Sequence, residues 1–256
     1  MINITNLTKY FGKNRIFKNL NLKINDRETL AIIGGSGCGK SVLLKHIIGI
    51  MKPDAGKIYI DDEDISNVDE ARLAEIRKHF GMVFQGAALF DSLTIGENVS
   101  FALARNTNIS KKEIDRIVHE KLALVGLGNI ENMKPAELSG GMRKRVGIAR
   151  AIAMEPNILL YDEPTTGLDP ITADVINNLI VDLHRKIGIT SVVVTHDMVS
   201  AYKISDRIAM MYGGEIVING TPDEIKNTKN PVVKQFITGS AVGPITAKNG
   251  GKTDEF

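Results

Sequence analysis

The chain has 256 residues, and its 32 Lys and Arg residues against 30 Asp and Glu residues give a net charge of +2. With 43% apolar and 24% charged residues, the composition is that of a globular protein and excludes a disordered tail, a fibre or a disulfide-stapled miniprotein. The single cysteine, Cys38, excludes an intrachain disulfide and a multi-cysteine zinc cage. Nucleic-acid-binding proteins usually carry clustered positive charge, and a net charge of +2 gives no reason to expect nucleic acid as a partner.

The length allows one large domain, or one domain with a substantial insert. No apolar run reaches the roughly 18 residues that cross a bilayer, and the first residues lack the apolar stretch of a secretory signal. We therefore expect a soluble, intracellular chain. Residues 245–256 have little apolar content and are expected to form a flexible tail.

The first elements predicted along the chain are strands. Residues 2–8 and 15–24 alternate polar and apolar side chains around a turn at Gly12, which predicts an antiparallel pair. An apolar strand at 29–34 leads through a glycine-rich turn into residues 40–50, whose apolar positions recur at helical spacing. Two further short strands are predicted at 57–60 and 81–84.

Helical patterns dominate from about residue 95 to 154, where the β-branched runs disappear, and we predict an all-helical insert there. Strand patterns return afterwards, at 157–161, 190–195, 207–211 and 214–220. A helical pattern at 171–187 separates the first of these strands from the second. Strands that alternate with helices favour an α/β fold with a mostly parallel sheet.

The strongest motif fits G-x-x-x-x-G-K-[ST] between a strand and a helix, as a phosphate-binding loop requires. Its members are Gly34, Gly35, Ser36, Gly37, Cys38, Gly39, Lys40 and Ser41. Successive glycines let backbone N–H groups point at phosphate oxygens, and the helix N-terminus adds its positive dipole end. Lys40 would reach the β- and γ-phosphates, and the Ser41 hydroxyl would bind Mg²⁺. The alternatives are a simple chain turn and a dinucleotide fingerprint, whose glycine spacing fits worse.

Two adjacent carboxylates, Asp162 and Glu163, end the apolar strand that begins near Ile158. A phosphate-loop ATPase needs one acid that holds Mg²⁺ and one base that orients and deprotonates the attacking water. Asp162 is the predicted metal residue and Glu163 the predicted base. The alternative is a solvated acidic turn before Pro164.

Gln85 and His196 also follow predicted strands, and the carboxyl ends of parallel strands converge on one crevice. Gln85 could bind Mg²⁺ or the attacking water, and His196 could donate a hydrogen bond to the γ-phosphate. Taken singly, a polar residue at such a position is more often a solvated loop residue. The remaining histidines are predicted to be structural or surface residues; they are His46, His79, His119 and His184.

The run Leu138-Ser139-Gly140-Gly141-Met142 resembles the signature of ABC-type ATPases. The phosphate loop, Gln85, the carboxylate pair, a Gly-Leu-Asp run at 167–169 and His196 complete the ordered set of motifs. The resemblance implies one ABC ATP-binding domain over residues 1–244, of the P-loop NTPase fold. Such a cassette has a parallel-sheet core, an antiparallel β subdomain and an inserted helical subdomain, here at about 86–155.

The same resemblance implies ATP and Mg²⁺ as cofactors, with Lys40, Glu163 and His196 acting on the γ-phosphate. It also implies a head-to-tail homodimer, in which residues 139–141 of one copy contact the phosphate that Lys40 of the other copy holds.

Two further positions follow from the resemblance. Phe11 would stack on adenine, with the neighbouring Tyr10 as the alternative. The family usually has Gln where this chain has Met142, but Ser139 and the two glycines are unchanged, so we expect turnover to be retained.

A narrower resemblance is to the Mla/Mkl subgroup, the ATPases of MCE-associated lipid transporters. It rests on residues 84–93, on the Met142 form of the signature, and on the run 233–239 with Gly243-Pro244. The subgroup commonly has S-G-A-L-F where this chain has G-A-A-L-F at 86–90.

This subgroup implies a peripheral ATPase on the cytoplasmic face of the bacterial inner membrane, with a separate integral membrane permease, a lipid as cargo and an MCE-domain protein as a further partner. The alternatives are a transporter for another solute, such as a nucleotide, amino acid or ion, and a soluble ABC ATPase outside transport.

Two side-chain groups remain. Leu89, Phe90 and Leu93 are either core residues of the helical subdomain or part of an apolar surface for the permease. The basic run from Arg143 to Arg145 is predicted to be a solvated helix face without a role in the site.

Overall fold

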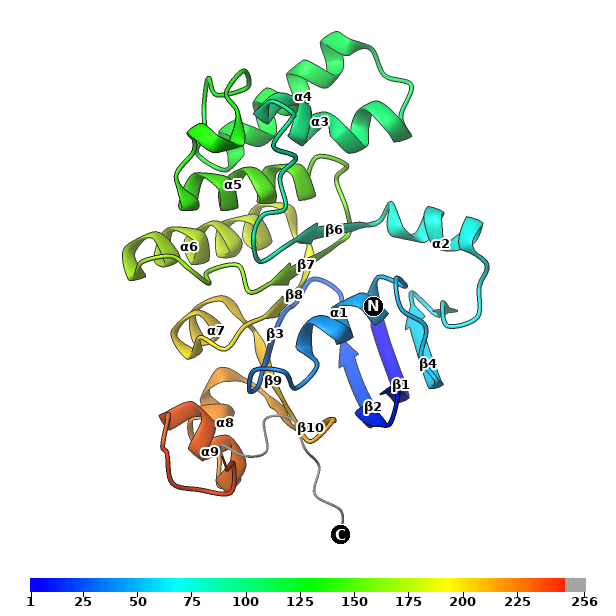
Figure 1. The fold of residues 1–256 in the computed structure, drawn as a ribbon, viewed down its shortest axis with the longest axis vertical. Coiled ribbons are helices and arrows are strands. Elements are labelled where there is room, and N and C mark those ends of the chain that lie inside the picture. Colours follow the sequence, from blue (N-terminus) through cyan, green and yellow to red (C-terminus); the bar gives the residue numbers. More distant parts are fainter. Residues whose placement is uncertain (247–256) are drawn as a thin grey trace. The chain divides into compact units, whose positions relative to one another are not determined.

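The computed structural model describes residues 1–246, and the chain divides into two compact units (Figure 1). The first unit consists of Met1–Arg77 together with the residues that follow Ser191, and the second is Lys78–Ser191. The second unit is therefore inserted between two parts of the first. It contains the region predicted to be helical and, in addition, the strands and the long helix on either side of it.

An antiparallel sheet forms the N-terminal part of the first unit, with strand order β2-β1-β4-β5. The strands are β1 (Ile2–Phe11), β2 (Asn14–Ile24), β4 (Ala55–Ile60) and β5 (Glu63–Asp64). Ile4 pairs with Leu22 on one side and with Ile58 on the other, and all three side chains are buried. The predicted polar and apolar alternation therefore puts one face of this sheet into the core.

The first unit also contains strands of a second sheet. Its fully buried strand β3 (Thr29–Ile33) pairs in parallel with β9 (Arg207–Tyr212). β9 in turn pairs antiparallel with β10 (Glu215–Gly220). The helices of this unit are α1 (Lys40–Ile47), α2 (Glu70–Arg77), α7 (Met198–Ile204), α8 (Pro222–Lys226) and α9 (Pro231–Thr238). Ile33, Met210 and Val233 belong to one buried cluster, so α9 packs on β9 and on β3, the strand that leads into the phosphate loop.

The second unit has a parallel strand pair, β6 (Phe80–Val83) and β7 (Ile158–Asp162). Its helices are α3 (Ile95–Asn106), α4 (Lys111–Leu124), α5 (Gly140–Ala151) and α6 (Pro170–Ile187), with a 3₁₀ turn, η1 (Pro135–Glu137). Each long helix begins at a residue whose side chain accepts a backbone N–H bond of the first turn: Thr94, Ser110, Ser139 and Asp169. β8 (Thr190–Val194) carries the chain back to the first unit.

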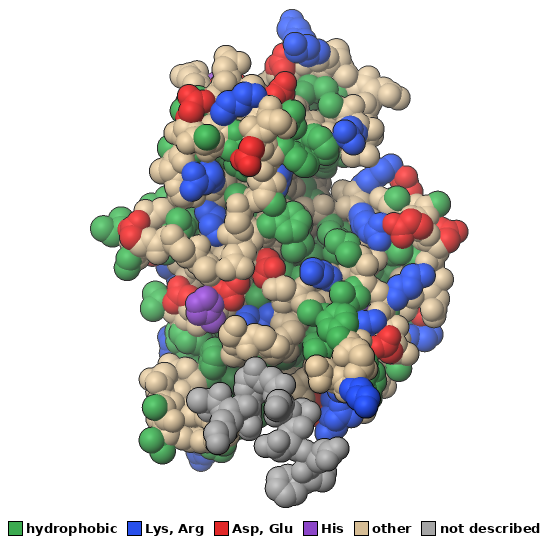
Figure 2. Space-filling view, viewed as in Figure 1, with side chains coloured by type: hydrophobic (Ala, Val, Ile, Leu, Met, Phe, Trp, Pro, Cys, Tyr) green, Lys and Arg blue, Asp and Glu red, His purple; other side chains and the backbone are tan. Residues whose placement is uncertain are grey.

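The C-terminal end of the described chain folds back onto α9. The buried Gln235 amide donates to the carbonyls of Ser240 and Ile245, and its oxygen accepts from the Ile245 amide. Residues 247–256 of the predicted tail lie outside the described residues. Among residues 1–246, no helix is both long enough and apolar enough to cross a membrane. Positive and negative side chains are interspersed over the face shown in Figure 2.

Candidate active site

The phosphate loop lies in the first unit, between β3 and α1. Every residue of β3 is buried, and the chain turns at Gly34, where φ is 154° and a Cβ would lie 2.5 Å from the Met211 carbonyl oxygen. α1 begins after Gly39, where φ is 102° and a Cβ would lie 2.8 Å from a methyl carbon of Ile16. Only glycine fits these two positions, so Gly34 and Gly39 are required by backbone conformation and by close neighbours.

The Lys40 ammonium folds back over the loop. Its Nζ atom donates to the carbonyl oxygens of Gly34, at 2.9 Å, and Gly35, at 3.2 Å, and the residue is 7% exposed. A positive charge is thus fixed inside the loop, beside the N-terminus of α1, where a phosphate is most stabilised. Ser41 follows in the first turn of the same helix.

Two aromatic side chains end β1 in the same unit. Tyr10 and Phe11 are 43% and 45% exposed, and the Tyr10 amide donates to Asp54 at 2.7 Å. Successive side chains of a strand point to opposite faces, so only one of the two can stack on a base bound at the phosphate loop.

His196 follows β8 on the first-unit side. The amide of Thr195 donates to the carbonyl of Ile32 at 3.1 Å, two residues before the phosphate loop begins. Asp197 then caps α7 by accepting from the amides of Val199 and Ser200. The structure therefore brings the exposed His196 to the end of β3 at which the phosphate loop starts.

In the second unit, Glu163 directly follows β7. The residue is 9% exposed and has a φ of 52°, a left-handed conformation that is uncommon outside glycine. The hydroxyl of Thr166 donates to its Oε2 atom at 3.1 Å. Asp162, one residue earlier, is half-buried. Such backbone strain at a buried carboxylate is typical of a functional residue.

Gln85 comes after β6 in the same unit, and its side chain is exposed. The following Ala87 and Ala88 both have positive φ, 62° and 48°. Arg150, on α5, donates to the carbonyls of both alanines at 2.7 Å. The turn after Gln85 is thus held against α5.

The signature residues form the start of α5. Ser139 is the N-cap, and its hydroxyl accepts from the Met142 amide at 3.3 Å. A Cβ on Gly141 would lie 2.5 Å from the Thr172 methyl of α6, so glycine permits the close approach of α5 and α6. Met142 enters the cap through its backbone, and the change from the family's usual Gln leaves the cap hydrogen bond in place.

The predicted site residues are divided between the two units. The first unit holds Phe11, the phosphate loop and His196. The second holds Gln85, the signature, Asp162 and Glu163. Of the remaining histidines, His46 is buried, His184 is half-buried, and His79 and His119 are exposed.

One prediction is wrong. Lys144, in the basic run assigned to a solvated face, is buried at 6% exposure, whereas Arg143 beside it is exposed. Lys144 lies three residues from Gly141 and from Gly147, both buried, so the helical spacing places it on the inner face of α5. That spacing was the signal from which its burial could have been predicted.

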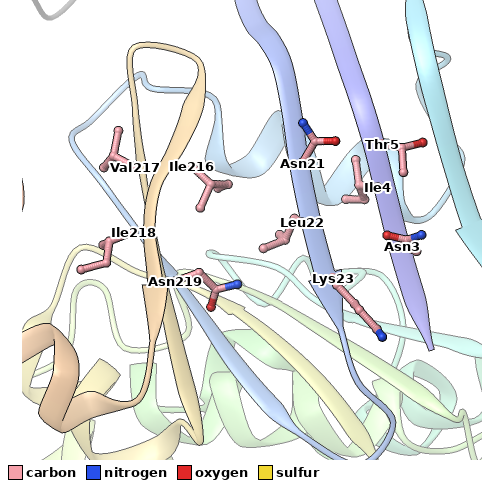
Figure 3. Close-up of a pocket in the computed structure, with 10 residues that line it drawn as sticks. All are labelled: Asn3, Ile4, Thr5, Asn21, Leu22, Lys23, Ile216, Val217, Ile218 and Asn219. Carbon is pink, nitrogen blue, oxygen red and sulfur yellow. The ribbon is translucent and has the colours of Figure 1, made fainter.

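A cavity of about 340 Å³ lies elsewhere in the first unit, between β2 and β10 (Figure 3). Residues 3–5, 21–23 and 216–219 line it, and the side chains of Leu22 and Ile216 project into the space between the two strands. None of the predicted site residues lines this cavity.

Comparison with known proteins decides the family. The profile described as ABC transporter matches residues 17–166, more than half of the chain, and this stretch includes the phosphate loop, the signature and the carboxylate pair. The chain belongs to the ABC transporter family. The ABC subunit is an ATP-binding, ATP-hydrolysing component, as predicted from its motifs.

Relatives of this ABC subunit include the probable ribonucleotide transport ATP-binding protein mkl of Mycobacterium tuberculosis, which is 43% identical over 95% of this chain and 68% of its own. The intermembrane phospholipid transport system ATP-binding protein MlaF of Haemophilus influenzae is 38% identical over 97% and 94% of the two chains. The predicted Mkl and MlaF resemblance is thereby confirmed.

A solved structure similar to this chain is the dimer of an ATP-binding cassette in a post-hydrolysis state bound to ADP and Pi. It has a TM-score of 0.79 and 37% identity, and the match covers 87% of this chain and 99% of that one. The predicted cassette fold, with parallel and antiparallel sheet parts, is confirmed.

Proposed function

We propose that this ABC subunit works as a head-to-tail homodimer that hydrolyses ATP on the cytoplasmic face of a bacterial inner membrane and drives a separate permease for phospholipid or another lipid. The observation that carries the hydrolytic part is Glu163, a buried and strained carboxylate directly after β7. The dimeric, ADP-bound relative supports the assembly. Similarity to MlaF over nearly the whole of both chains supports the cargo class.

In this proposal Lys40 and the loop amides bind the phosphates, and Phe11 stacks on adenine. Glu163 accepts a proton from the attacking water, and His196 donates a hydrogen bond to the γ-phosphate. The Glu163 carboxylate is mostly buried and bonded to Thr166, and a carboxylate held in one orientation suits this role.

The side chains predicted to bind Mg²⁺ offer ligand atoms that suit this ion. Ser41, Gln85 and Asp162 offer a hydroxyl, an amide and a carboxylate oxygen, the hard donors that Mg²⁺ takes together with phosphate oxygens. Mg²⁺ held there would neutralise charge that develops on the phosphates during cleavage.

The head-to-tail arrangement is supported by the start of α5. Ser139, Gly140 and Gly141 form the cap and first turn of a 12-residue helix, whose N-terminus favours an anion. The phosphate that they contact belongs to the nucleotide of the other copy.

The permease would bind around Phe90. The Phe90 ring is 43% exposed and lies 4.6 Å from the ring of Phe101, centroid to centroid. Arg105 lies over Phe101 at 4.3 Å, and Arg150 lies 6.0 Å from the Phe90 centroid. Buried Asn98 fixes this arrangement, because it accepts from the Phe90 amide and donates to its carbonyl. An aromatic pair with one exposed ring, flanked by arginines, suits an apolar helix with an acidic side chain.

Leu89 and Leu93 are half-buried, so neither of the two predicted alternatives, a core position or an exposed apolar surface, describes them fully.

A second cargo class also has support, since the relative mkl is named for ribonucleotide transport.

One purification tests the cargo and the permease. The full chain with a C-terminal affinity tag is isolated from detergent-extracted membranes of its native cells, and the co-purifying proteins are identified by mass spectrometry. We expect an integral membrane permease and an MCE-domain protein. Recovery of a permease with a binding protein for a polar solute would overturn the lipid cargo, and recovery of no membrane protein would overturn the transport function.

The isolated complex then decides whether hydrolysis drives transport. Reconstituted in phospholipid vesicles, it should transfer a labelled phospholipid only with ATP. The same complex carrying Glu163→Gln is the matched control, which should assemble equally well and transfer nothing.

A further inference from the structure

Lys144 is a buried cation whose surroundings differ from those of the other lysines on the helices of the second unit. Its ammonium donates to the backbone carbonyl of Gln85 and, at 3.4 Å, to the backbone carbonyl of Glu163. These two oxygens belong to separate segments, one after β6 and one after β7. A single side chain therefore joins both segments to α5.

Placing a cation here is unfavourable in itself. Burial lowers the pKa of the Lys144 ammonium, and the negative charge of Glu163 opposes that fall. An apolar side chain of similar length would fill the space without this desolvation cost. Packing alone thus gives no reason for a lysine at this position, whereas hydrogen bonds to two backbone carbonyl oxygens of separate segments do.

The segments that Lys144 joins are strained. Glu163, Ala87 and Ala88 all have positive φ, between 48° and 62°. Residues in this conformation persist only where neighbours hold them. Arg150 holds the alanine carbonyls, and Gly147 allows Ala87 to approach α5 so closely that a Cβ on the glycine would be 3.2 Å from the alanine Cβ.

We propose that Lys144 is a positioning residue, which ties the signature helix to the backbones of Gln85 and Glu163. The inference rests on the proposed function, in which the Ser139 end of α5 contacts the nucleotide of the other copy while Gln85 and Glu163 act on the nucleotide of their own. Lys144 then transmits the docking of the signature at one nucleotide to the alignment of the base at the other.

The test is a double-mutant cycle in the full chain with Lys144→Met, Glu163→Gln and both together. Lys144→Met should lower kcat by about 10-fold or more, because a small displacement of a catalytic group has effects of this size. Equilibrium binding of a fluorescent ATP analogue should change by less than about twofold, since the phosphate loop is untouched. In the Glu163→Gln background the lysine substitution should have little further effect on turnover.

Two controls separate positioning from stability. Lys121→Met removes a lysine that is 14% exposed and bound to Glu155 at 2.8 Å in the same unit, and it should leave kcat within about twofold. Lys144→Arg keeps charged donors at this position and should restore at least about half of the wild-type kcat.

The outcomes are distinct. If Glu163→Gln alone keeps full turnover, the assignment of the base fails and the inference fails with it. If Glu163→Gln slows turnover but Lys144→Met does not, only the inference fails. The inference also fails if the two effects multiply. Should Lys144→Met melt below the assay temperature, Lys144→Gln takes its place in the cycle with the same criteria.

Discussion

Glu163 illustrates how backbone conformation and chemistry meet at a single residue. Its left-handed φ directs the chain away from β7 immediately after Asp162, and its carboxylate is nonetheless mostly buried. Replacing it with Gln keeps shape and hydrogen bonding but removes the proton acceptor. We expect ATP hydrolysis to fall by about 100-fold or more while ATP binding is retained.

Steady-state phosphate release and equilibrium ATP binding measure the two effects of Glu163→Gln separately. Lys40→Ala should show the opposite pattern, with binding itself weakened. Glu120→Gln, on the exposed surface of α4, is the control and should change neither quantity. Full turnover in the Glu163→Gln protein would exclude Glu163 as the base.

His46 makes folding depend on pH. Its side chain is fully buried on α1, and burial lowers its pKa below the ordinary value of 6.5, against the bond to the Val42 carbonyl at 2.8 Å. The unfolded chain therefore takes up this proton at a higher pH than the folded chain. Stability should fall as the pH drops through about 6.5 toward the folded pKa.

Thermal unfolding of wild-type protein and of His46→Gln, measured from about pH 7.5 to 5.5, tests this effect. On acidification, the melting temperature of the variant should fall less than that of the wild type. His79→Gln, at an exposed position, should follow the wild type. An identical pH dependence in all three proteins would show that His46 contributes nothing to it.

At the scale of elements, the turn after β6 and helix α3 together present the Phe90 and Phe101 rings. Because Phe90 is 43% exposed, Phe90→Lys should fold normally while adding a third positive charge beside Arg105 and Arg150. The subunit should then be released from membranes, with ATP binding unchanged. Membrane fractionation and ATP-analogue binding measure the two effects.

Ile187→Lys is the matched control, since Ile187 is 49% exposed at the end of α6. It should remain with the membranes. If Phe90→Lys instead unfolds, the ring belongs to the core. If it folds and stays bound to membranes, the permease binds elsewhere.

At the scale of the whole molecule, the Glu163→Gln protein should form a stable dimer when ATP is added, because binding proceeds and cleavage does not. Gly140→Asp supplies the contrast. A Cβ on Gly140 meets only a Leu168 methyl, at 3.6 Å, so the substitution fits the fold but places a carboxylate at the phosphate-binding end of α5. Glu163→Gln with Gly140→Asp should bind ATP and remain monomeric by light scattering; a dimer would contradict the head-to-tail arrangement.

The long helices α4 and α6 could be predicted from sequence because their apolar periodicity is strong, and the buried strand β3 because its apolar run is continuous. The short helices α2, α7, α8 and α9 were not predicted. Each has at most 8 residues, too few for a clear period, and α9 depends on burial of Val233 against the strands. The phosphate loop and carboxylates have motifs, and the helical spacing of α5 carries a signal for the burial of Lys144, but no sequence pattern marks the positive φ of Glu163.

The attachment of the turn after β6 to α5 uses backbone oxygens. Lys144 and Arg150 bind the carbonyls of Gln85, Ala87 and Ala88, and any residue type provides such a carbonyl. If the segment around Phe90 binds the permease as proposed, substitutions there need not disturb these hydrogen bonds to α5. Such a cassette can acquire a new membrane partner through surface substitutions while its ATP-hydrolysing site is unchanged. Transporters can then diversify in cargo and keep the same hydrolytic reaction.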